Sequence, residues 1–171
     1  MNSTMKMFSV FLLSAFVMYV SASGTNIVFA GVETGVDTGQ KAAPFKLLSV
    51  EGKEIELESF AEGRVTLLVF GTTWCPSCRH EVPILKEYYD ELKDDGLKVL
   101  GIDVQESKKK VSSFVEKNRI NYPVALDSNA DVARLYQVVG IPLNIVLDKK
   151  GVIRYKDNRP PSKEILEKLL N

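Results

Sequence analysis

One stretch limits the fold more than any other: an apolar strand pattern that runs directly into two closely spaced cysteines. Residues 65–70 are almost all β-branched or aliphatic, which is typical of a strand covered on both faces. Cys75 and Cys78 follow, and apolar residues then recur every three or four positions until Gly96. This spacing predicts an amphipathic helix that begins at the cysteine pair. The unit is therefore strand, Cys-x-x-Cys, helix.

The rest of the chain alternates between strand and helix patterns. Ser107 and Ser162 each precede an apolar helical pattern and are predicted N-caps. Two turn signals, Glu51-Gly52 and residues 148–151, predict hairpins. We expect an α/β fold whose central mixed, mostly parallel sheet is flanked by helices, with an N-terminal β-hairpin. The predicted strands are 45–50, 53–57, 97–104, 123–126, 143–147 and 152–155, and a further helix is predicted over 129–137.

The first thirty residues differ from the remainder. Lys6 precedes an apolar run, and small residues at 21–23 and 28–30 suit a signal peptidase. No charged residue lies between Met7 and Val32, so an uncleaved membrane anchor fits equally well. We predict a signal peptide or uncleaved membrane anchor over 1–30, a linker over 31–41 and one domain over 42–171. The domain is expected outside the cytoplasm, in the periplasm or on the outer face of the cytoplasmic membrane.

Composition excludes several classes of function. Lys and Arg together number 22, as do Asp and Glu, and their scattered arrangement gives no basic surface for nucleic acid. Two cysteines and a single histidine are too few for a closed zinc site. Covalent haem attachment needs His directly after the second cysteine, where Arg79 stands. We therefore expect no metal and no cofactor.

The cysteine pair predicts reversible sulfur chemistry. Cys75 lies where unpaired N–H groups and the helix dipole favour an anion, so it is the predicted nucleophile. Cys78, three residues on, is close enough to close a ring with it and is the predicted resolving thiol. A disulfide spanning so short a loop would restrict the unfolded chain little, which argues against a purely structural bond.

Four aromatic or titratable residues lie on or next to this predicted helix. Trp74, directly before the nucleophile, is expected to be partly exposed beside the sulfur. His80 falls on the opposite side of the helix from Cys78 and is expected to be a surface residue. Tyr88 and Tyr89 are expected to pack the helix against the sheet.

Together these motifs resemble the thioredoxin superfamily, and within it the TlpA/ResA-like extracytoplasmic thiol-disulfide oxidoreductases. The resemblance covers 42–171 and is carried by W-C-x-x-C-x-x-E-x-P over residues 74–83, by Gly140-Ile141-Pro142 and by an inserted strand and helix at 122–137. It implies a thioredoxin-like fold, a cis-proline at Pro142 and a buried Glu81 that relays a proton to the resolving thiol. The alternative for Glu81 is an acid favoured by the helix dipole. The substrate-binding residues that the resemblance implies are Trp74, Pro76, Ile141 and Pro142.

The sequence departs from thioredoxin at Val69, where thioredoxin has a buried aspartate, so Glu81 is the only nearby candidate for a proton relay. The Pro76-Ser77 dipeptide leaves the direction of electron flow open, and we favour a reductant. Expected partners are exported proteins with disulfides, including apocytochrome c, and a membrane electron donor. The protein is expected to be a monomer.

Two other functions remain as alternatives to this one. A peroxidase of the peroxiredoxin type is suggested by Thr72, three residues before Cys75, but Leu68 occupies the position of that motif's proline. A Cu(I)-binding chaperone could use both thiolates, but such relatives usually add a distant histidine and wider cysteine spacing.

Overall fold

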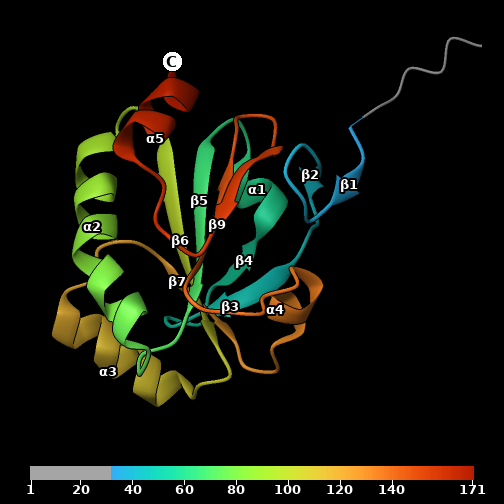
Figure 1. Ribbon diagram of the computed structural model, residues 1–171. Helices are drawn as coiled ribbons and strands as arrows, with labels where there is room; N and C mark the ends of the chain where they lie inside the picture. The colour runs from blue at the N-terminus through green and yellow to red at the C-terminus, as the bar shows by residue number, and fades with distance from the viewer. Residues whose placement is uncertain (1–31) are drawn as a thin grey trace, which may run out of the picture.

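The computed structural model describes residues 32–171, and its core is a seven-stranded sheet with the order β4-β3-β7-β6-β5-β8-β9 (Figure 1). The predicted central strand is β5 (Val65–Gly71), which pairs in parallel with β6 (Leu97–Val104) and antiparallel with β8 (Leu143–Leu147). Residues 65–70 of β5 are all buried, as a strand covered on both faces requires.

The outer strands complete the sheet on both sides. Next to β6 lies β7 (Val124–Asp127), followed by β3 (Lys46–Ser49) and β4 (Glu54–Glu56), and β9 (Ile153–Asp157) lies beyond β8. Both predicted hairpins, β3–β4 and β8–β9, are confirmed. The sheet is mixed as predicted, but only the β5–β6 and β6–β7 pairs are parallel, because hairpins reverse the chain at both edges.

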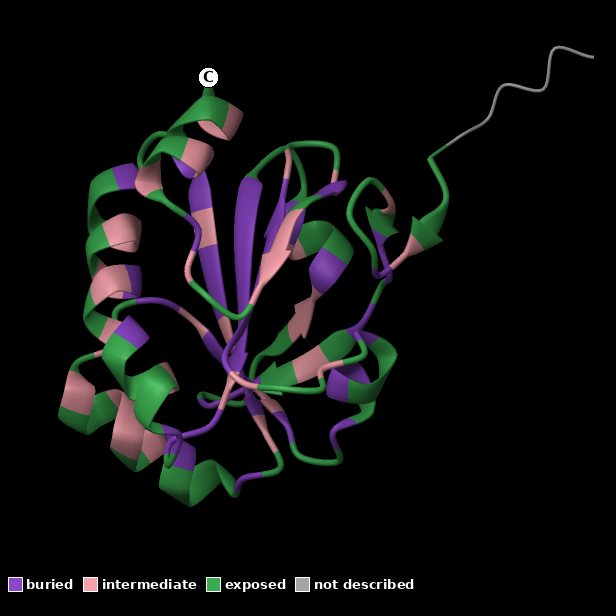
Figure 2. Cartoon of the chain, in the orientation of Figure 1, coloured by how far each residue is buried: buried purple, intermediate pink, exposed green. Residues whose placement is uncertain are grey.

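Helices cover both faces of the sheet and separate two hydrophobic clusters. The helices α2 (Pro76–Leu92), α3 (Lys108–Asn118) and α5 (Lys163–Leu170) lie together on one side, and α1 (Leu57–Ala61) and α4 (Asp131–Leu135) lie on the other (Figure 1). Alternate residues of β5 serve the two clusters, with Leu67 in one and Leu68 in the other. Figure 2 shows the central strands as the most continuously buried part of the chain.

Element boundaries follow local hydrogen bonds. Ser107 caps α3 as predicted, its hydroxyl accepting the N–H of Lys110, whereas Ser162 occupies the N-cap of α5 without a side-chain bond. The helix α4 is shorter than predicted because the Asp127 carboxylate accepts the N–H groups of Val132 and Ala133 and fixes its start. The second arm of the first hairpin is also shorter than predicted, because Leu57 begins α1 and is buried in the core.

The segment predicted as a linker is packed onto the domain where it is described. The short strands β1 (Thr34–Gly35) and β2 (Lys41–Ala42) pair with each other, and Val36 between them is buried. Gly39 N–H donates to the carbonyl of Ile153 on β9. Residues 31–41 are mostly polar, and one buried valine is too weak a signal to predict packing, so the sequence predicts a linker.

The predicted signal peptide or anchor lies outside the described residues. Among residues 32–171, no helix is both long enough and apolar enough to cross a bilayer.

Candidate functional site

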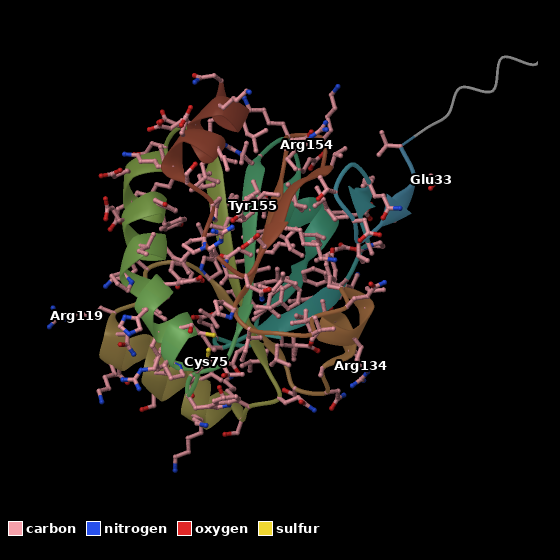
Figure 3. All side chains as sticks on the ribbon, in the orientation of Figure 1. Glu33, Cys75, Arg119, Arg134, Arg154 and Tyr155 are labelled. Atoms are coloured by element: carbon pink, nitrogen blue, oxygen red, sulfur yellow. The ribbon has the colours of Figure 1, made fainter. Side chains whose placement is uncertain are left out.

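Cys75 begins the helix α2. It is the N-cap residue, and Pro76 takes the first helical position, where its fixed φ is already suited to the helix. The backbone N–H of Cys78 donates to the Cys75 sulfur over 3.3 Å, which is the contact expected for an anion at the start of a helix. Both cysteines are free thiols at the N-terminal end of α2, where Figure 3 labels Cys75.

The loop with the predicted cis-proline contacts the Cys75 sulfur. The Ile141–Pro142 peptide bond is cis, as the resemblance implied, and Cys75 Sγ lies 3.8 Å from the carbonyl oxygen of Ile141. Asn158 holds this loop from the other side, donating from Nδ2 to the carbonyls of Gly140 and Pro142 over 3.1 and 2.6 Å. Residues 75 and 141, far apart in sequence, are therefore in contact.

An open groove lies between Trp74, the proline loop and α4, while Cys75, directly after Trp74, is only 5% exposed. Trp74 on its rim is 63% exposed, which agrees with the prediction, and Val139 is fully exposed. Its other walls come from Gln105, Arg134 and Ile141, with Arg134 labelled on α4 in Figure 3. Exposed apolar side chains beside a polar rim are typical of a surface that binds a partner.

Cys78 faces the sheet rather than the groove. Its sulfur rests over Gly71 of β5, so closely that a β-carbon at Gly71 would lie only 3.2 Å from it. A larger residue at position 71 would displace the sulfur, so the close approach of Cys78 favours glycine at this position. Burial raises the pKa of the Cys78 thiol to about 12, and the adjacent Cys75 sulfur adds to the rise.

Glu81 is buried one turn after Cys78, as predicted. The side-chain amide of Asn144 on β8 donates to both of its carboxylate oxygens, over 3.3 and 3.1 Å. Burial raises the pKa of Glu81, and the Asn144 contact opposes the rise. Asn144 pairs with Val69 in the sheet, so the position that holds aspartate in thioredoxin here lies beside an amide. Sequence reasoning did not identify Asn144. The signal that could have found it is a single polar residue in an otherwise apolar, buried strand.

Two further buried acids near the cysteines were also missed. Glu106 accepts hydrogen bonds from the backbone N–H and hydroxyl of Thr73, over 2.5 and 2.9 Å, and is paired with Lys110. Burial alone would raise the pKa of Glu106, but the Lys110 and Thr73 contacts hold it below its usual range. Burial, together with the charge of Glu106, raises the pKa of Asp103 to about 8. Both acids come from the carboxyl end of β6, the edge where parallel strands commonly place functional groups.

The other predicted positions lie as follows. His80 is exposed, and Tyr88 and Tyr89 pack against the cluster beneath α2, as expected. Leu68, the position of the peroxiredoxin proline, is fully buried within the β5 ladder, where proline would remove a hydrogen bond. Within residues 32–171, no group of three or more His, Cys, Asp or Glu side chains is arranged to hold a metal ion.

Comparisons with known proteins agree with this geometry. The pattern of the AhpC/TSA family matches residues 38–156. The thiol-disulfide oxidoreductase ResA of Bacillus thuringiensis subsp. konkukian is 32% identical over 138 residues, covering 81% of this chain and 79% of that protein. The sporulation thiol-disulfide oxidoreductase A of Bacillus subtilis is 28% identical, covering 88% and 92% respectively.

A solved structure supports the fold directly. The thioredoxin domain of a thiol-disulfide oxidoreductase from Bacteroides vulgatus superposes with a TM-score of 0.72 at 26% sequence identity. The superposition covers 80% of this chain and all of that domain. The thioredoxin-like fold that the resemblance implied is therefore confirmed.

Proposed function

The chain belongs to the AhpC/TSA family and is a thiol-disulfide oxidoreductase, and from this premise we propose that it reduces disulfides in exported proteins through Cys75. One observation carries the proposal. The Cys75 sulfur lies at the N-terminus of α2, in contact with both the Cys78 N–H and the Ile141 carbonyl, and Ile141 also lines an open groove.

The first step is attack by the Cys75 thiolate on a partner disulfide. A bond forms between Cys75 and one partner sulfur, and the other partner sulfur leaves as a thiolate that takes a proton from solvent. The helix N-terminus supports the nucleophile because its free N–H groups favour a negative sulfur. The product is a mixed disulfide.

The groove beside Cys75 would position the partner. Trp74 and Val139 present apolar surface for side chains next to the attacked cysteine. The backbone at Ile141 and Pro142, where proline leaves no competing N–H, would pair with an extended partner segment in a strand-like manner. Pro76, directly after Cys75 and exposed, is a further proposed contact for the partner.

Cys78 would then resolve the mixed disulfide. Its sulfur attacks Cys75, the Cys75–Cys78 disulfide forms, and the electron pair of the broken bond leaves on the partner sulfur. Cys78 must lose a proton to do this, and burial holds that proton tightly. Glu81, buried beside it, is the first candidate to assist the transfer.

The cellular setting rests on the sequence. The uncharged N-terminal segment supports export, with the protein either released or held at the membrane. A reductant in that location must be re-reduced by a membrane electron donor. Apocytochrome c, whose thiols must be reduced before haem attachment, is the target class that we test first.

The decisive experiment is covalent trapping with the full chain. The Cys78→Ser variant is expected to accumulate a mixed disulfide with exported proteins, because attack proceeds and resolution does not. The Cys75→Ser variant is the matched control and should trap nothing. Trapping by Cys75→Ser alone would reverse the roles of the two sulfurs, and trapping by neither would refute the proposal.

A peroxide assay separates this function from that of a peroxidase. We expect the reduced protein to reduce insulin disulfides in a Cys75-dependent way and to consume hydrogen peroxide no faster than Cys75→Ser. Rapid Cys75-dependent peroxide consumption without insulin reduction would favour the peroxidase instead.

A further inference from the structure

A small cavity lies between the sheet and the helices α2 and α3, behind the cysteine pair. Its volume is about 60 Å³, which is enough to admit water. Most of its wall is apolar, but three polar residues meet at one end: Thr72, Cys78 and Asp103. Asp103 is 7% exposed and Thr72 9%, so these groups are almost removed from solvent.

The sheet register places Asp103 beside the Cys78 sulfur. Gly71 of β5 pairs in parallel with Asp103 of β6, so the two residues direct their β-positions to the same face of the sheet. That face carries α2, because the Cys78 sulfur lies over Gly71. Neighbouring strands are about 5 Å apart. Since Gly71 has no side chain, nothing from β5 separates the sulfur from the Asp103 carboxyl group.

The buried acids around Cys78 differ in how many of their carboxylate oxygens already accept a hydrogen bond or an ion pair. Both oxygens of Glu81 accept hydrogen bonds from Asn144. Both oxygens of Glu106 are also occupied, by Thr73 and by Lys110. Among the residues that the structure describes, Asp103 Oδ1 and Thr72 Oγ1 have no hydrogen-bond partner, and both residues line the cavity. Asp103 therefore has a free acceptor and lines the same cavity as the resolving thiol.

We propose that Asp103 accepts the proton of Cys78 when Cys78 resolves the mixed disulfide, directly or through a water molecule in the cavity. This inference rests on the proposed function and adds a second proton acceptor to Glu81. The Cys78 S–H bond breaks and its proton goes to the Asp103 carboxylate. The sulfur electron pair then forms the bond to Cys75, and the partner sulfur leaves as a thiolate.

The surrounding charges agree with this role. Burial, reinforced by Glu106, raises the pKa of Asp103 to about 8, and a base whose pKa lies near the working pH transfers protons most effectively. Below that pH Asp103 holds its own proton, so resolution should accelerate as the pH rises through about 8. The titratable and charged groups that face Cys78 and Asp103 are Cys75 and Glu81 on α2, Glu106 after β6, Lys110 on α3 and Tyr122 before β7.

A two-phase thiol assay tests the assignment in the full-length reduced protein. One equivalent of an aromatic disulfide reagent, 5,5′-dithiobis(2-nitrobenzoate), releases one coloured thiolate when Cys75 attacks and a second when Cys78 resolves the adduct. In Asp103→Asn, we expect the second phase at pH 8 to slow by about tenfold or more, with the first phase within about twofold of wild type. The inflection near pH 8 in the wild-type second phase should disappear.

Three matched proteins make the result specific. Cys78→Ser should show only the first phase, which assigns the phases. Asp90→Asn removes an exposed acid from the outer side of α2 and should leave both phases unchanged. Glu81→Gln should alter the second-phase rate but keep the inflection near pH 8.

The outcomes separate this inference from the function on which it rests. Absence of a Cys75-dependent first phase in wild type would refute the proposed function. A normal first phase with an unchanged second phase in Asp103→Asn would refute the role of Asp103 alone, as would equal slowing of both phases, which indicates a structural effect. If Asp103→Asn does not fold, a wild-type second phase without an inflection near pH 8 refutes it.

Discussion

Cys75 and Cys78 are separated by two residues on one helix, yet their surroundings differ in almost every respect. Cys75 is buried at the helix terminus and contacts backbone groups of α2 and the proline loop, whereas Cys78 lines a cavity together with Gly71 and the buried Asp103. The first environment places the Cys75 sulfur next to the proline loop, and the second surrounds Cys78 with the groups that we propose take its proton. Two chemically identical groups are thereby directed to different steps by the secondary structure around them.

The sharpest test of this contrast is removal of each sulfur in turn. Cys75→Ala should lower insulin reduction by about 10³-fold or more, because no nucleophile remains to form the mixed disulfide. Cys78→Ala should retain the initial attack, measured as release of one thiolate from a disulfide reagent. Equal loss of the initial attack in both variants would show that the two environments are not specialised.

The acidic environment of Cys78 predicts an unusual pH dependence of stability. The folded protein raises the pKa of Asp103 from 3.8 to about 8, so the folded state binds this proton more tightly than the unfolded state. Its contribution favours folding most below pH 4 and is lost as the pH rises through 8. Asp103→Asn should therefore gain stability at pH 9, on the order of 2 kcal/mol, and gain little at pH 4.

Urea unfolding of the reduced proteins at both pH values measures this difference. Asp90→Asn serves as the control, because its carboxylate is exposed in the folded state. A gain for Asp103→Asn that is larger at pH 4 than at pH 9 would contradict the sign predicted here.

On the Cys75 side, the groove predicts a defect confined to large substrates. Trp74→Ala removes an aromatic ring that is 63% exposed, and should raise KM for a protein disulfide by about tenfold. Its reaction with a small disulfide reagent should change by less than about twofold. Leu48→Ala, which removes an exposed apolar residue on β3, is the control. Equal effects of Trp74→Ala on both substrates would place the ring in the chemistry rather than in docking.

The smallest expected effect is a loss of stability on substitution of Thr73, which lies two residues before Cys75 and contacts the buried Glu106. Its hydroxyl donates to Glu106 over 2.9 Å, so Thr73→Val should destabilise the protein by about 1 kcal/mol. Thr66→Val is a matched control, because the buried Thr66 hydroxyl has no partner and its loss should be neutral or stabilising. The urea midpoints of the two variants, compared with wild type, give the answer, and equal losses would contradict it.

Most of the fold and the cysteine pair could be predicted from sequence because they depend on local patterns. The apolar run of β5, the Ser107 cap and the spacing along α2 each lie within a few residues. The helix α1 was missed because five residues are too few to establish a helical period.

The remaining site residues could not be predicted because they depend on strand pairing. Asp103 shares a cavity with Cys78 because of its register with Gly71, and Asn144 reaches Glu81 because β8 lies next to β5. Neither relation is visible before the order and register of the strands are known. Glu106 could not be identified for the same reason, because it follows β6 whereas its partner Thr73 follows β5.

The position of the short strands β1 and β2 has a consequence for approach to the reactive sulfur. Glu33, at the entry of the chain into the fold, and Cys75 lie at opposite ends of the molecule in Figure 3. Val36 and the Gly39 bond to Ile153 fix that entry point on the body of the protein. Chain entry and the reactive cysteine therefore lie apart, and none of residues 33–39 lines the groove next to Trp74.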